Sequence, residues 1–145
     1  GSVVSHVRIG EEIHSPLLPK GSADVIIAFE PAEAVRCISY LKPQGTVIVN
    51  QKAVRPVTAS LSGTYIDGTE MITYLQQQAG QVKVMDGEAI CDRCGSSKVL
   101  NIVLLAAAAK SGALGITVEE LKSAITNRIP ERFQELNLRA VELVK

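Results

Sequence analysis

Apolar and polar residues alternate at the start of the chain, with a period of two between Val3 and Ile9. One side of this segment carries Val3, Ser5, Val7 and Ile9, and the other side carries Val4, His6 and Arg8. Such alternation is typical of a half-buried β-strand. Pro16 and Pro19 follow in residues 14–21, which we therefore expect to form a loop.

Two uninterrupted apolar runs come next, at residues 24–30 and 46–50. Runs of this kind are typical of strands that are covered on both faces. Between them, apolar residues recur at helical spacing over residues 32–41, and Pro31 suits the first turn of a helix. The order strand, helix, strand predicts a right-handed crossover between parallel strands.

The second half of the chain predicts more helix than strand. Residues 53–68 are rich in Pro, Ser, Thr and Gly and predict a connection. A strand is expected at 81–86, and helices are expected at 70–79, 88–93, 96–110, 118–127 and 130–145. The helix at 96–110 is apolar on nearly every side, so we expect the sheet and a partner to bury it. Thr117 and Glu120 have the spacing of a capping box.

These elements together predict an α/β fold, in one domain covering residues 1–145. We expect a three-layer, Rossmann-like sheet that is mostly parallel or mixed, with helices on both faces. A sheet of this type usually opens with a strand and a glycine-rich turn, which the sequence lacks. We therefore expect that an N-terminal strand and helix are missing.

Composition narrows the range of functions. Fifteen basic residues balance fifteen acidic ones, so the sequence lacks the excess of positive charge that nucleic-acid binding normally requires. It has no apolar run of about 18 residues, so we expect no transmembrane helix. An odd number of cysteines, three, favours a reducing compartment, and we expect the protein in the cytoplasm.

Cys91 and Cys94 form a CxxC pair, which could act as a redox couple or as half of a metal site. A structural zinc site needs four ligands, and Cys37, His6 and His14 lack matching spacing. Two buried thiols are therefore the favoured interpretation.

Other polar residues have two interpretations each. His6 and Arg8 share one side of the first segment and could bind a carboxylate, a phosphate or a partner's acid, or could simply face solvent. Lys98 and Asn101 lie one turn apart on the apolar helix, where they could contact a partner or satisfy backbone groups. Residues 60–68 resemble an anion-binding loop only weakly, because no GxGxxG motif is present. No catalytic constellation is visible, which favours an accessory subunit or a binding domain.

Several segments resemble a known family in their order and spacing: SVVSHVRIG at 2–10, SPLLP at 15–19, ADVIIAFEP at 23–31, LKPQGTVIVN at 41–50, KVLN at 98–101 and ELNLRA at 135–140. They are similar to the gamma-type domain of 2-oxoacid:ferredoxin oxidoreductases, and within that family to the indolepyruvate type. The missing front is where the sequence departs from the family pattern.

The resemblance implies a subunit of a complex that decarboxylates an arylpyruvate on thiamine diphosphate. Two electrons would pass through iron–sulfur clusters to ferredoxin, and the acyl group would go to coenzyme A. The thiamine diphosphate, Mg and clusters would belong to a partner alpha subunit, so that this chain holds no cofactor and no catalytic residue. His6, Arg8, Lys98 and Asn101 would face the partner or the substrate channel. The alternatives are a free-standing nucleotide-binding regulatory module, which would use the loop at 60–68, and a thiol–disulfide protein, which would use Cys91 and Cys94.

Overall fold

A computed structural model describes residues 2–52 and 68–145 of the chain. Its centre is a sheet of three parallel strands in the order β1-β2-β3, formed by β1 (Ala23–Ala28), β2 (Leu41–Asn50) and β3 (Gln81–Met85). All three lie where the sequence predicts strands, and their parallel pairing confirms a crossover between parallel strands. Of the two forms of sheet that we expected, the described strands form the parallel one.

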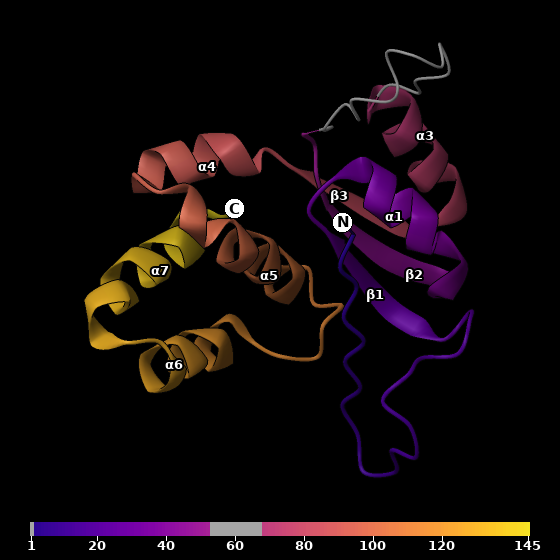
Figure 1. Cartoon of the computed structure of the whole chain (residues 1–145), viewed down its shortest axis with the longest axis horizontal. Helices are drawn as coiled ribbons and strands as arrows, with labels where there is room; N and C mark the ends of the chain where they lie inside the picture. The colour runs from indigo at the N-terminus through magenta and orange to yellow at the C-terminus, as the bar shows by residue number, and fades with distance from the viewer. Residues whose placement is uncertain (1, 53–67) are drawn as a thin grey trace.

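Side chains of β2 alternate between two separate cores. Val47 and Val49 point to one face and Ile48 to the other, and all three are fully buried. The first face is covered by α1 (Pro31–Cys37) and α3 (Gly68–Gln78). The second face is covered by α5 (Leu100–Lys110), so the sheet lies between two helical layers (Figure 1). The predicted three-layer architecture is confirmed.

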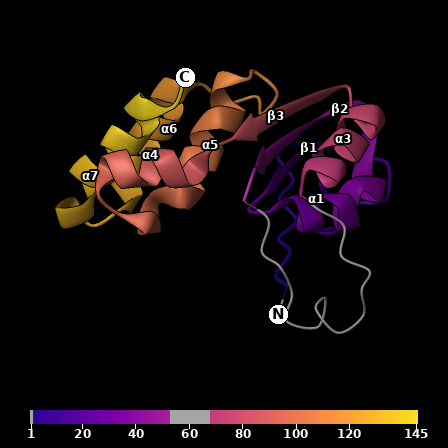
Figure 2. The ribbon, with the colours of Figure 1, turned by 90° about the horizontal axis from the view of Figure 1, so that it is seen from above.

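Three further helices pack around α5, on its side away from the sheet (Figure 2). They are α4 (Gly87–Cys94), α6 (Val118–Arg128) and α7 (Glu131–Leu143). Residues 102–104 and 106–109 of α5 are all buried. The prediction that this helix is covered on nearly every side is confirmed, but the sheet and these three helices of the same chain provide the cover.

Two short 3-10 helices, η1 (Ile38–Tyr40) and η2 (Ser97–Val99), lead into β2 and α5. β2 begins at Leu41, five residues before its predicted start. Its first part is irregular, because Ala23 pairs with Leu41 but Val25 pairs with Thr46. Gln44 in this part has a φ of 64°, in the left-handed region. The apolar run at residues 46–50 therefore predicted only the regularly paired part of β2.

The strand predicted for residues 3–9 is absent, so the expected extra strand at the front of the chain is wrong. No backbone group of these residues forms a backbone hydrogen bond with another described residue. A β-strand exists only where a neighbouring strand completes its ladder, and no described strand pairs with this segment. Alternation alone therefore did not decide the structure.

The ends of the last helices follow the sequence closely. Thr117 Oγ1 accepts a hydrogen bond from the Glu120 N–H at 3.1 Å, and Glu120 Oε1 accepts one from the Thr117 N–H at 3.2 Å. This confirms the predicted capping box. Pro130 immediately precedes α7. Among the helices of the described ranges, none has the length and apolar character that crossing a bilayer requires.

Candidate functional site

Residues 2–18, which we call the N-terminal arm, run beside α1 before they form a loop. Ser2 Oγ donates to Glu33 Oε2 at 2.7 Å, in the first turn of α1. The His6 ring packs edge-on against the Tyr40 ring, with 5.3 Å between the ring centroids. Because Tyr40 ends η1, the arm follows this helical segment from its beginning to its end.

His6 and Arg8 hold the arm's loop in place. His6 Nδ1 accepts a hydrogen bond from the Leu18 N–H at 3.0 Å. In its neutral form the imidazole therefore carries its proton on Nε2. Arg8 Nη1 donates to the Ser15 carbonyl oxygen at 2.9 Å and, more weakly, to that of Leu17 at 3.5 Å. The other guanidinium nitrogens of Arg8 form no hydrogen bond with a described residue.

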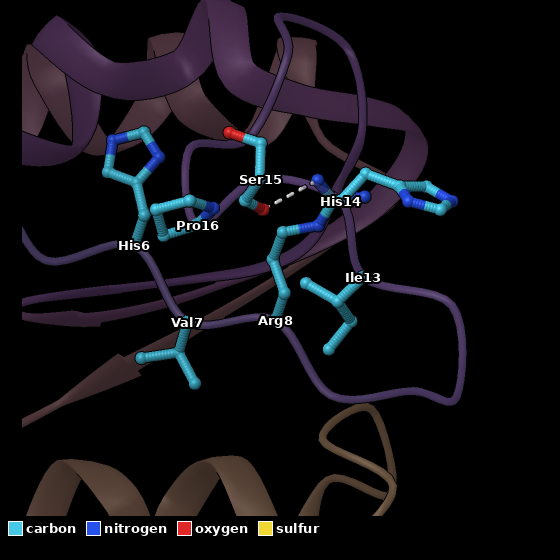
Figure 3. A pocket seen from close by; sticks show the side chains of 7 residues that line it. All are labelled: His6, Val7, Arg8, Ile13, His14, Ser15 and Pro16. Atoms are coloured by element: carbon cyan, nitrogen blue, oxygen red, sulfur yellow. Dashed lines mark hydrogen bonds between the residues drawn. The ribbon is translucent and has the colours of Figure 1, made fainter.

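The arm lines an open surface hollow of about 460 Å³. Its lining consists of His6, Val7, Arg8, Ile13, His14, Ser15 and Pro16 (Figure 3). The lining contains one guanidinium and two imidazoles but no carboxylate, which suits a negatively charged group. Figure 3 shows the Arg8 side chain turned toward Ser15, with the His6 ring apart from it. His6 and Arg8 thus line the same hollow, but their side chains do not converge on one point.

Lys98 and Asn101, the other predicted pair, are both exposed. Lys98 lies in η2, where its backbone N–H donates to Ser96 Oγ at 3.2 Å, and Asn101 lies in the first turn of α5. Neither residue lines the hollow of the N-terminal arm. The structure therefore does not bring the four predicted residues together, and their role toward a partner stays a prediction.

Asn50 is a buried polar residue that the sequence analysis missed. It ends β2, is 2% exposed, and its Oδ1 accepts a hydrogen bond from the Gly87 N–H at 2.9 Å. A Cβ atom on Gly87 would lie only 2.8 Å from that oxygen and 2.4 Å from Leu100 Cδ1. Asn50 thus fixes the start of α4 against the end of β2. The sequence signal that could have identified Asn50 is its position as a polar amide at the end of the apolar run 46–50.

Asn50 lies at the carboxyl edge of the sheet, where parallel α/β proteins usually bind ligands. At the same edge, Lys52 Nζ forms an ion pair with Glu88 Oε1 at 2.5 Å. The anion loop predicted at residues 60–68 cannot be placed at this edge, because residues 60–67 lie outside the described part of the chain. We therefore assign no binding site to Asn50, Lys52 and Glu88.

The CxxC pair belongs to a packed helix. Cys91 and Cys94 are buried free thiols in the last turn of α4. Burial chiefly raises the pKa of the Cys91 thiol, and the neighbouring Cys94, Asp92 and Glu88 act in the same direction. A redox cysteine needs the opposite, a lowered pKa of the kind that a helix N-terminus provides. Within the two described ranges, no three His, Cys, Asp or Glu residues are grouped so as to hold a metal ion.

We expect iodoacetamide to modify Cys91 more slowly in the folded protein at pH 8 than in the urea-unfolded chain. The raised pKa leaves less thiolate at that pH, and burial restricts access. Peptide mass spectrometry over a time course measures the rate for each cysteine, and the half-buried Cys37 provides an internal comparison. Equal rates for Cys91 in both states, or ready formation of a Cys91–Cys94 disulfide, would contradict this interpretation.

Nearly the whole sequence is similar to proteins of one known family. Residues 1–144 match the family described as pyruvate ferredoxin/flavodoxin oxidoreductase. The chain is 34% identical over 145 residues to the indolepyruvate oxidoreductase subunit IorB of Thermococcus kodakarensis, covering 99% of this chain and 72% of that protein. It is 35% identical over 141 residues to the subunit of the same name from Methanothermobacter thermautotrophicus, covering 97% and 71%.

A solved structure has a similar fold. It is the gamma subunit of a keto/oxoacid ferredoxin oxidoreductase from Geobacter sulfurreducens PCA, with a TM-score of 0.57 and 21% sequence identity. The match covers 85% of this chain and 62% of that chain, so this chain spans less than two thirds of that subunit. The likeness supports the α/β architecture described above.

Proposed function

Because the chain belongs to the pyruvate ferredoxin/flavodoxin oxidoreductase family, we propose that it is a subunit of an indolepyruvate-type 2-oxoacid:ferredoxin oxidoreductase. The observation that carries this proposal is identity of 32–35%, across nearly the whole chain, to four proteins named indolepyruvate oxidoreductase subunits. The complex converts an arylpyruvate, coenzyme A and two oxidised ferredoxins into acyl-coenzyme A, carbon dioxide, two reduced ferredoxins and one proton, which comes from the coenzyme A thiol.

In this proposal the reactive cofactors belong to a partner alpha subunit. Thiamine diphosphate with its Mg ion supplies the decarboxylation chemistry there, and iron–sulfur clusters carry the electrons. This division is what the family resemblance implies. The given sequence has three cysteines, whereas one cubane cluster is held by four cysteine thiolates. It also lacks a Gly-Asp-Gly motif for a metal-bound diphosphate.

The residues of this chain then face the partner or the channel that leads to its active site. Arg8 offers a guanidinium in a hollow without a carboxylate, so it suits an acid of the partner or an anionic substrate passing by. His6 fixes the loop that shapes this hollow. Lys98 and Asn101 are both exposed and would form a second polar contact with the partner.

Sedimentation velocity tests this assignment. We expect the chain, mixed with the purified thiamine-dependent subunit of the same organism, to sediment as one larger complex. Two separate boundaries at micromolar concentration would contradict the proposal. Tight binding of ATP by the isolated chain in calorimetry would instead favour a nucleotide-binding module.

A further inference from the structure

Two limbs form the loop of the N-terminal arm, and side chains join them. The first limb is residues 6–8, the second limb is residues 13–18, and both contribute to the lining of the hollow (Figure 3). Residues 2–20 form no backbone–backbone hydrogen bond with any described residue. Three hydrogen bonds cross between the limbs, one at His6 and two at Arg8. Within the described part of the chain, these two side chains therefore hold the loop closed.

One of the three bonds depends on the protonation state of a histidine. The Leu18 N–H donates to His6 Nδ1 at 3.0 Å, which requires the lone pair of a neutral imidazole. In the imidazolium form both ring nitrogens carry hydrogen, so Nδ1 would face the Leu18 N–H as a second donor. Arg8 stays charged throughout the pH range in which histidines titrate, so its two bonds do not respond to a proton in this way.

The ring of His6 is held in place by its surroundings. It is half-buried and packs edge-on against the Tyr40 ring, at an interplanar angle of 88°. A flip of the ring by a half turn would place a carbon atom where Nδ1 now lies, and a carbon atom cannot accept the Leu18 N–H. Rotation of the ring therefore does not restore the bond once the imidazole is protonated.

The charged groups around His6 do not favour a second proton on its ring. The hollow beside it has Arg8 and His14 in its lining and no carboxylate. Tyr40 of η1 contributes a phenol ring, which is uncharged at neutral and acid pH. None of the ion pairs between described residues involves His6.

The carboxylates of the arm and of α1 have other places. Glu11 and Glu12 lie between the two limbs in the sequence and do not line the hollow. Glu33 of α1 accepts a hydrogen bond from Ser2 Oγ and pairs with Arg36 at 3.1 Å. Protonation of His6 thus removes one bond between the limbs, and no described ion pair replaces it.

We infer that His6 is a pH-sensitive latch: protonation of its ring releases Leu18, and the second limb of the loop moves away from the first. Histidines take up a proton between about pH 8 and about pH 5, so the latch is closed at the upper end of this range and open at the lower end. Arg8 alone then joins the limbs. All residues of this contact belong to this chain, so the inference depends neither on the proposed function nor on a partner.

Hydrogen exchange of the Leu18 amide, followed by NMR, tests the latch. The measured rate is compared with that of an unstructured peptide at the same pH, which removes the intrinsic pH dependence of exchange. We expect the protection of the Leu18 amide to fall by about 2- to 10-fold between about pH 8 and about pH 5, which is the effect of losing one hydrogen bond. A change of less than about twofold, or protection that rises toward acid, overturns the inference.

Two variants identify the histidine that is responsible. His6→Phe keeps a ring beside Tyr40 but has no acceptor, so the protection of Leu18 should be low and should not change with pH. The matched control is His14→Phe, at the other histidine that lines the hollow, which should keep the wild-type fall in protection. Neither histidine belongs to a buried core, and circular dichroism verifies the fold. The inference is wrong if Leu18 in His6→Phe stays protected or pH-dependent, or if His14→Phe removes the pH dependence.

Discussion

Replacing Leu104 with alanine is expected to lower the free energy of unfolding by about 2–5 kcal/mol. Leu104 is fully buried in the middle of α5 and belongs to the same core as Ile48 of the sheet, Leu121 of α6 and Val141 of α7. The substitution leaves a cavity where the sheet and the helical layer meet. Because several elements share this contact, they cannot all move to fill the space.

Urea unfolding followed by circular dichroism measures this effect, with the midpoint and the slope fitted together. The matched control is Asn101→Ala, an exposed position on the same helix, which should change the free energy of unfolding by less than about 0.5 kcal/mol. If Leu104→Ala were as mild as the control, α5 would not be the central helix of this core.

Gly80→Ala is expected to lower the free energy of unfolding by about 1–3 kcal/mol, through a steric clash. A Cβ atom at this position would lie 2.5 Å from the Gln44 carbonyl oxygen and 2.7 Å from Gln44 Cα. These are backbone atoms of β2, so no flexible side chain can move aside. The Gly80 N–H also donates to the Gly45 carbonyl oxygen at 2.9 Å, and that bond would lengthen if the strands separated.

Thermal and urea unfolding of Gly80→Ala, compared with Gly10→Ala, provide the test. Gly10 has no atom near the site of an added Cβ, so its substitution should change stability by less than about 0.5 kcal/mol. Equal stability of the two variants would show that Gly80 and Gln44 are farther apart than in this structure.

Most of the fold could be predicted from local pattern. The apolar run at 46–50 gave a central strand because a strand covered on both faces needs no alternation. The capping box of Thr117 and Glu120 was predictable because its hydrogen bonds join residues three positions apart. Residues 3–9 were misassigned because strand formation depends on a distant neighbour, which periodicity does not reveal.

The candidate site was predictable only in part. The sequence singled out His6 and Arg8, and both line one hollow, but their contacts with Leu18 and Ser15 depend on how the loop folds back. Asn50 was missed because its importance comes from Gly87, 37 positions later. Lys98 and Asn101 remain predicted partner contacts, since only a partner subunit can show what they touch.

Reconstituted turnover tests the central claim most directly, namely that this chain acts beside a partner that owns the reactive cofactors. The measurement is ferredoxin reduction that depends on indolepyruvate and coenzyme A, with this chain alone, with the thiamine-dependent subunit alone, and with both. We predict no reduction by this chain alone and full activity when both subunits are present. Sustained turnover by this chain in the absence of the other subunit would contradict the account.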